Sequence, residues 1–233
     1  MKIEHPHGNI KIFFLKKCEK ILKHLIFLIV SLFYKINRKE NEIIISTAFY
    51  APWKSNKNFY LFYEKIKNLT LLDIKRLYTL WYFTSDLKNI NANILDVGCL
   101  QGGAGFLMSK ANNKGQTYLL DTFEGFAEEE EFHKRKHFVF DDINSLKNNI
   151  KKLKLKNIKV FKCKFPEKIN FVIKQGKFKI CHLDVNTYKS TKKSFEFIKN
   201  KMIKGGVIIF DDYGIYGVDG VKKFIDVISK KNK

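Results

Sequence analysis

Two patterns of apolar and polar positions alternate over the C-terminal part of the chain. Short runs of apolar residues, typical of strands buried on both faces, alternate with stretches of helical spacing. The predicted strands cover residues 94–97, 117–121, 158–161, 178–184 and 206–212; the predicted helices lie before residue 111 and over 143–153, 166–174, 189–202 and 221–229. Strands that alternate with helices form parallel sheets covered on both faces. The sequence therefore predicts an α/β fold, a doubly wound parallel sheet of at least five strands.

The region before this sheet is helical in pattern and rich in aromatic residues. Asn58 and Thr70 stand where helix N-caps would be expected. We expect most of the aromatic side chains in the core, the alternative being that some of them line a pocket. The chain is thus predicted to have three parts: a basic apolar N-terminal segment over residues 1–40, a helical lead-in over 41–90 and the sheet domain over 91–233.

The N-terminal segment has apolar residues at helical spacing between flanking lysines. Its uninterrupted weakly polar run covers only residues 25–34, about 15 Å of helix, which is half of a bilayer core. Bulky residues follow this run, so a signal peptide fits poorly. Three alternatives stay open: a helix that packs on the body or on a second subunit, an interfacial helix on an anionic membrane through residues 21–39, and a transmembrane span.

Composition and charge favour a folded domain with extensions. The chain has 233 residues, 45% of them hydrophobic, which excludes a disordered or collagen-like protein. Its formal net charge is +21, but its only arginines are Arg38, Arg76 and Arg135. Proteins that read nucleic-acid sequence depend on bidentate arginine contacts, so the lysine excess predicts attraction to anions and no nucleic-acid partner.

The four cysteines indicate neither a metal site nor a disulfide framework. Cys18, Cys99, Cys163 and Cys181 show no CxxC spacing. Reduced thiols predict a cytoplasmic protein. In the interfacial alternative, the protein would lie peripherally on the inner face of the membrane.

A glycine-rich loop follows the first predicted strand in DVGCLQGGAGF. Asp96 ends this strand, and Gly98, Gly102 and Gly103 precede a helix whose N-terminus favours negative groups. The GxxxGGxG spacing departs from the GxGxxG of dinucleotide sites and matches the looser pattern of S-adenosylmethionine methyltransferases. Asp121 ends the second strand, where a carboxylate can accept both ribose hydroxyls of an adenosine cofactor.

Three aspartates follow the fourth and fifth predicted strands. Asp184 comes after one strand, and Asp211 and Asp212 end the next, so parallel pairing brings all three to one edge of the sheet. Clustered carboxylates repel unless they are protonated or bridged by a cation. Oxygen ligands favour Mg²⁺, or alternatively Mn²⁺ or Ca²⁺.

Other ionisable residues are expected to have structural roles. The run 128–131 is interpreted as a solvated loop that could also shade the site. His133 and His137 lack the glutamate of an HExxH zinc motif. His182 lies inside a buried strand pattern, which favours a satisfied core histidine over a base.

Together these residues resemble the macrocin O-methyltransferase family, the metal-dependent sugar O-methyltransferases of antibiotic and surface-glycan pathways. The resemblance covers about residues 50–226, in APW, LTLLDIKRLYTLW, DVGCLQGGAGF, DTFEGF, FPE, LDVNTYKST and GGVIIFDDYG. It implies a Rossmann-like class I methyltransferase fold, S-adenosylmethionine as cofactor, a divalent cation such as Mg²⁺, and methyl transfer to a hydroxyl of a sugar or glycan acceptor.

The resemblance also implies roles for individual residues. Asp184, Asp211 and Asp212 would be the metal ligands, and Asp184 would also be the catalytic base. Asp96, Gly98, Gly102, Gly103 and Asp121 would form the cofactor site, with Lys164 in the 163–165 segment near the adenine.

Two features depart from the family pattern. Asn186 stands where a second aspartate is common, and an amide cannot act as a base. The usual last two strands of the fold are expected to be missing, which leaves the fifth strand as a bare edge unless a second subunit or the N-terminal segment covers it. These departures support an alternative, an impaired or truncated methyltransferase-fold protein acting as a membrane-associated scaffold in glycan assembly.

Overall fold

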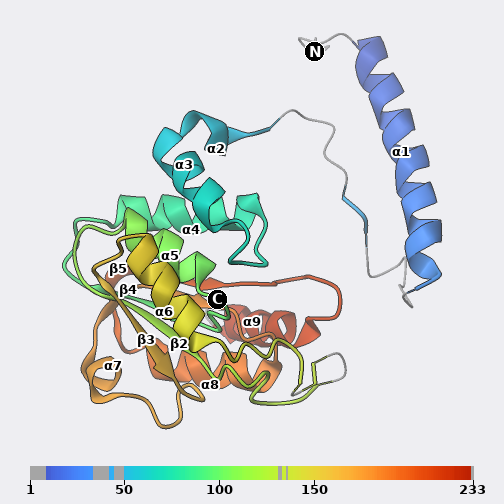
Figure 1. The fold of residues 1–233 in the computed structure, drawn as a ribbon. Coiled ribbons are helices and arrows are strands. Elements are labelled where there is room, and N and C mark those ends of the chain that lie inside the picture. Colours follow the sequence, from blue (N-terminus) through green and yellow to red (C-terminus); the bar gives the residue numbers. More distant parts are fainter. Residues whose placement is uncertain (1–8, 34–41, 45–49, 131–132, 135, 232–233) are drawn as a thin grey trace. The chain divides into compact units, whose positions relative to one another are not determined.

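The computed structural model describes residues 9–33, 42–44, 50–130, 133–134 and 136–231. The chain divides into two compact units, Met1–Pro52 and Trp53–Lys233. Helix α1 (Asn9–Ser31) belongs to the first unit (Figure 1) and begins twelve residues before the apolar stretch that starts at Ile21. Among the described residues, no helix combines the length and the apolarity needed to cross a bilayer.

The second unit contains the predicted doubly wound sheet. Its five strands are all parallel and lie in the order β3-β2-β1-β4-β5. The strands are β1 (Asn93–Val97), β2 (Thr117–Asp121), β3 (Ile158–Lys162), β4 (Phe178–Leu183) and β5 (Met202–Phe210). The helices from the start of this region are α2 (Pro52–Ser55), α3 (Lys57–Ile66), α4 (Ile74–Asp86), α5 (Gly103–Ala111), α6 (Ile143–Lys152), α7 (Phe171–Gln175), α8 (Tyr188–Ile198) and α9 (Asp219–Lys231).

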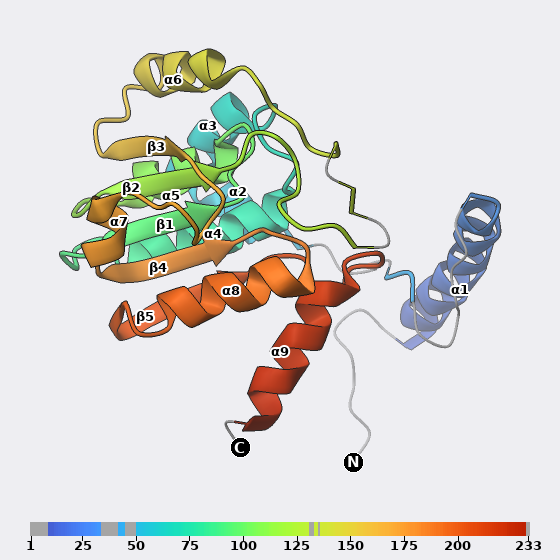
Figure 2. The same ribbon diagram turned by 90° about the horizontal axis from the view of Figure 1, so that it is seen from below.

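Alternating strand residues divide the core into two layers. Ile94 faces a cluster formed with the helices α3 to α6, and its neighbour Leu95 faces a cluster formed with α7 and α8. Figure 2 shows α7 and α8 in front of the strands and α4 and α5 behind them. The predicted burial of both faces is confirmed, and it explains why the central strands read as continuous apolar runs.

Strand β5 forms one edge of the sheet in the described part of the chain, where it pairs with β4. Its residues are mostly half-buried. Helix α9 contributes Phe224, which packs against Phe210 at the end of β5 and against Phe195 of α8. The aromatic contact fixes the C-terminal end of β5 next to the candidate site.

Local capping corrects several expected boundaries. The N-caps are Asn56 and Asp73, whose side chains accept backbone N–H groups of α3 and α4, so the predicted caps at Asn58 and Thr70 were wrong. The helix expected over 166–174 begins only after Asn170, which caps Val172. The helix expected over 189–202 ends at Ile198, and the strand expected from residue 206 begins at Met202. Met202 is already part of the strand because it pairs with β4.

A buried lysine ties together three segments at the amino-terminal ends of the strands. Lys179 is fully buried, and its Nζ donates to the carbonyl oxygens of Ile90 at 2.8 Å and Lys114 at 2.9 Å and to Oδ1 of Asn112 at 2.7 Å. Burial lowers the pKa of Lys179 to about 8, so the ammonium is still mostly protonated at neutral pH. These acceptors replace water around the charge.

Replacing Lys179 by methionine should therefore destabilise the protein by about 3 kcal/mol, because buried acceptors lose their donor while the side-chain volume is kept. Denaturant unfolding followed by circular dichroism measures the change. The matched control is the exposed Lys177→Met variant, which should change the free energy of unfolding by less than about 0.5 kcal/mol. Equal stability of the two variants would contradict the structural role of Lys179.

Candidate active site

Strand register aligns the predicted site residues at the carboxyl edge of the sheet. Val97 pairs with Leu120 on one side and Leu183 on the other, and Leu183 pairs with Phe210. The residues that follow these positions are Gly98, Asp121, Asp184 and Asp211. The edge lies where strand order changes direction around β1, the usual ligand position in open α/β sheets.

The glycine loop is shaped by close backbone contacts. Gly98 has φ +87°, and a Cβ at this position would lie 1.8 Å from the carbonyl oxygen of Asp184. Gly102 also has positive φ and caps α5. The N–H of Gly103 donates to Leu69 O at 2.9 Å, so this glycine packs α5 against the lead-in. Glycine is needed at Gly98 because any side chain would push β1 and β4 apart.

Asp121 holds the loop from the neighbouring strand. Its Oδ2 accepts the N–H of Leu100 at 2.8 Å, and its Oδ1 accepts the N–H of Phe123 at 2.8 Å. Burial raises the pKa of Asp121, and these two backbone donors oppose that shift. Each carboxylate oxygen keeps lone-pair capacity for a further donor, as binding of a ribose diol would require.

Asp96 and His182 form a buried pair beneath the loop. The Nδ1 of His182 lies 2.8 Å from Oδ1 of Asp96, and both residues are at most 1% exposed. The core position expected for His182 is confirmed, but its Nε2 has no hydrogen-bond partner among the described residues, so the ring is only half satisfied. Burial opposes the charged ring, but Asp96 and nearby carboxylates raise the pKa of His182 to about 9.

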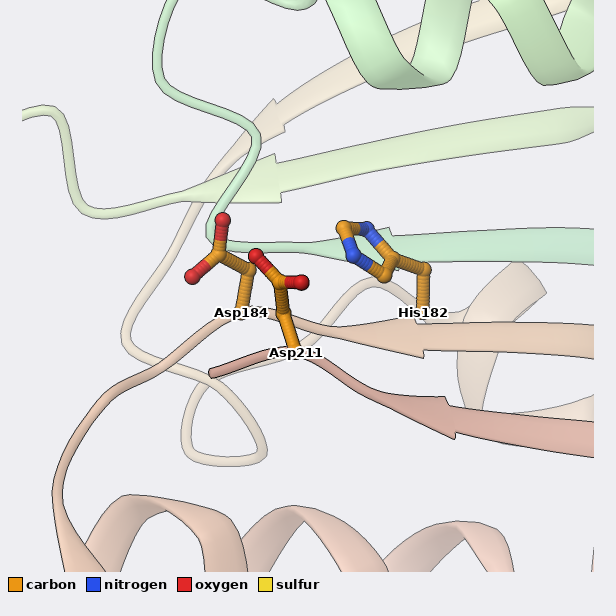
Figure 3. A group of neighbouring side chains, drawn as sticks. All are labelled: His182, Asp184 and Asp211. Atoms are coloured by element: carbon orange, nitrogen blue, oxygen red, sulfur yellow. The ribbon is translucent and has the colours of Figure 1, made fainter. Parts of the chain in front are cut away.

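The carboxylates of Asp184 and Asp211 converge on this histidine. Figure 3 shows them at the ends of β4 and β5, with the ring of His182 beside them. One potential ligand atom from each of the three residues lies within 4.8 Å of the other two. Burial and the Asp211 carboxylate raise the pKa of Asp184 well above its usual range. A positive charge at this position would relieve the repulsion.

Arg76 of α4 supplies such a charge to one side of the cluster. Its Nη1 lies 2.7 Å from Oδ2 of Asp211 and 2.9 Å from Oδ1 of Asp212. The arginine therefore holds both Asp211 and Asp212, and Asp211 also lies beside Asp184 and His182. Arg76 was not predicted as a site residue from the sequence. The available signal was that arginine is rare in this lysine-rich chain, and a guanidinium group suits paired carboxylates.

Lys164 lies in an ion network after β3. Its Nζ is 3.4 Å from Glu128 and 3.6 Å from Glu167. Glu128 also pairs with Lys189 at 3.0 Å and Lys193 at 3.2 Å, and its hydrogen bonds with these lysines lower its pKa to about 2. The expectation that Glu128 is merely solvated was wrong, because it ties the loop after β2 to α8; Glu131, in the same run, lies outside the described residues.

Asn186 lies two residues beyond Asp184 in the loop after β4. It has φ +57°, and its Nδ2 lies 3.4 Å from Nε2 of His133. His133 is 6% exposed, and burial lowers its pKa, which favours the neutral imidazole. The ring contacts Phe126 edge-on, so the expected structural role of His133 agrees with its packing.

Comparisons with known proteins agree with this geometry. The sequence profile of the family described as Macrocin-O-methyltransferase (TylF) matches residues 68–233. No curated protein matched the sequence. The chain is similar to the O-methyltransferase NovP, with a TM-score of 0.60 and 19% identity over 70% of this chain and 74% of NovP.

Two further solved structures have the same fold. The calicheamicin methyltransferase CalS11 is similar with a TM-score of 0.59 and 12% identity over 81% of this chain and 91% of CalS11. An O-methyltransferase from Bacillus cereus, solved with SAH, has a TM-score of 0.52 and 16% identity over 79% and 82% of the two chains.

The parallel sheet and the similar solved structures define a Rossmann-like class I methyltransferase fold, and the family match identifies the chain as an S-adenosylmethionine-dependent O-methyltransferase. The family match covers more than half of the chain. The chain belongs to the macrocin O-methyltransferase family.

Proposed function

We propose that this enzyme transfers a methyl group to a sugar hydroxyl with the help of a divalent cation, in the biosynthesis of a surface polysaccharide or another glycan. The observation that carries the proposal is the alignment of Gly98, Asp121, Asp184 and Asp211 along one sheet edge. This alignment supports a cofactor site at the glycine loop, beside carboxylates that would hold a cation. A solved structure with the same fold is a TDP-rhamnose 3'-O-methyltransferase, which supports a nucleotide-linked sugar as the first acceptor to test.

The residues present fit both groups. The loop at Gly98 and the carboxylate of Asp121 would hold S-adenosylmethionine, with Asp96 buried beneath them and Lys164 kept as a predicted contact. Asp184 and Asp211 would hold the cation. The buried, unpartnered Nε2 of His182 faces them as a further donor, and its Nδ1 is oriented by a carboxylate as metal-bound histidines usually are. Asp212 would contribute to the cation site either by holding Arg76 in place or, if it releases Arg76, as a ligand itself.

Asp184 is the proposed base. When bound, S-adenosylmethionine would supply an electrophilic methyl group and leave as the thioether once its sulfur–methyl bond breaks, and the cation would stabilise negative charge on the acceptor oxygen. Asp184 would accept the proton of the attacking hydroxyl as the oxygen–methyl bond replaces the sulfur–methyl bond. Arg76 keeps Asp211 oriented at the edge of the sheet, and the rigid strand ends hold the reacting groups within reach of each other.

Replacing Asn186 by aspartate tests whether a base is missing. If Asp184 is the base, N186D should change the rate of methyl transfer by no more than about threefold. A gain of about tenfold or more would place the base at position 186 and identify the natural chain as impaired, as in the scaffold alternative. Initial rates with saturating S-adenosylmethionine measure the difference, and thermal unfolding checks that the variant is folded.

The proposal is tested by transfer of labelled methyl groups from S-adenosylmethionine to a panel of nucleotide-linked sugars. Reactions with Mg²⁺, Mn²⁺ or a chelator separate the metal requirement from the acceptor requirement. Transfer that is lost with the chelator and restored by a divalent cation supports the proposal. Transfer unaffected by the chelator would contradict the metal role, and absence of transfer by a protein that binds S-adenosylmethionine would favour the scaffold alternative.

A further inference from the structure

Helix α1 carries a continuous apolar stripe. At 100° per residue, positions 14, 18, 21, 25, 28 and 32 follow one line along the helix, with 15, 22 and 29 beside it. Large apolar side chains of the stripe are 46–65% exposed within their unit: Phe14, Leu15, Ile21, Leu22, Leu25, Leu28 and Ile29. A helix of 23 residues is about 34 Å long, so the stripe runs over most of that length.

The opposite face of α1 carries lysines over its first half, and Phe27 and Val30 follow on the same face. Lys16, Lys17, Lys20 and Lys23 lie there, and the helix has five lysines and one glutamate, a net charge of +4. Lys23 pairs with Glu19 at 2.8 Å and with Glu42 at 3.1 Å. Residues 42–44 therefore pack beside the basic face, and the described residues of the same unit leave the apolar stripe uncovered.

We infer that α1 binds the surface of an anionic lipid bilayer, lying in the interface with its apolar stripe among the acyl chains. The stripe consists almost entirely of aliphatic and aromatic side chains, and lysines lie on the opposite face, as is typical of interfacial helices. The long lysine side chains can extend toward anionic headgroups while the stripe is buried. This inference does not depend on the reaction catalysed.

Charge favours a lipid surface over a second copy of the helix. Two copies paired through the stripe would leave the lysines of both helices without a counter-charge. An anionic membrane instead gains from every lysine. The same lysines predict binding that weakens as salt is raised.

The test is co-sedimentation of the full chain with vesicles of phosphatidylglycerol and phosphatidylcholine mixtures or of phosphatidylcholine alone. We expect binding to the anionic vesicles at least about tenfold tighter than to the neutral ones. The double variant Leu25→Asp/Ile29→Asp should lose this binding. The matched control is Leu61→Asp on α3, an apolar side chain that is 65% exposed outside the stripe, which should bind as the natural chain does.

A second variant keeps the test independent of helix folding. Lys16→Gln/Lys20→Gln retains the apolar stripe and should weaken binding to anionic vesicles about tenfold, with little effect on neutral ones. Circular dichroism verifies the helix content of each variant. Absence of vesicle binding by the natural chain would overturn the inference. So would a stable oligomer that becomes monomeric in the Leu25/Ile29 variant, because the stripe would then be a protein interface.

Discussion

Replacing Asp184 by asparagine should lower the rate of methyl transfer about 10³-fold while the fold and the binding of S-adenosylmethionine are kept. The substitution removes the proposed base and one charge of the proposed cation site, but it keeps the size of the side chain. The pKa of Asp184 is raised by burial and by Asp211, so the ionised carboxylate is unfavourable without a cation. The variant should therefore unfold at the same temperature as the natural chain or at a higher one.

The measurement is kcat/KM with an accepted sugar, together with calorimetric binding of S-adenosylmethionine. The control is Asp86→Asn, which neutralises an exposed carboxylate at the end of α4 and should leave both quantities unchanged. If D184N kept more than about a tenth of the natural activity, neither the base nor the metal role of Asp184 would stand.

The second large effect is expected at Gly98. An alanine there would place Cβ 1.8 Å from the Asp184 carbonyl oxygen at φ +87°, so the loop after β1 and the end of β4 must separate. We expect a loss of about 3 kcal/mol or more in the free energy of unfolding. Cofactor binding should fall at least about tenfold, because the same loop carries the proposed cofactor site and borders Asp184.

Gly205 provides the matched control for this prediction. It has φ +77°, and a Cβ at this position meets no atom of the described residues within 4 Å, so Gly205→Ala introduces backbone strain without the collision. Its cost should be only about 1 kcal/mol. Thermal and denaturant unfolding compare the two variants. Equal costs would show that the contact between Gly98 and Asp184 does not constrain the sheet edge.

Much of the fold could be predicted from the sequence because local and tertiary signals agree. The central strands are buried on both faces, and their apolar runs are bounded by loops, so β2 was predicted with its observed bounds. Boundaries set by partners could not be found in this way. Strand β5 begins at Met202 because it pairs with Phe178, and no local pattern around Met202 indicates that pairing.

The candidate site was predicted only in part: its position at the sheet edge was expected, but several of its side-chain contacts were not. The position of Asp184 and Asp211 at one edge follows from strand order, which periodicity can predict. Arg76 reaches Asp211 from a helix 135 residues away in the sequence. The pairing of His182 with Asp96 requires the register of β1 against β4. Such contacts depend on three-dimensional packing, which spacing along one chain does not encode.

Calorimetric titration of S-adenosylmethionine into the full chain, with and without Mg²⁺ or Mn²⁺, tests the central claim most directly. The natural protein should bind the cofactor with a dissociation constant on the order of 10 μM or tighter. It should also bind the divalent cation, and the Asp211→Ala/Asp212→Ala variant should lose the cation while it keeps the cofactor. A well-folded natural protein that binds no S-adenosylmethionine under these conditions would contradict the account.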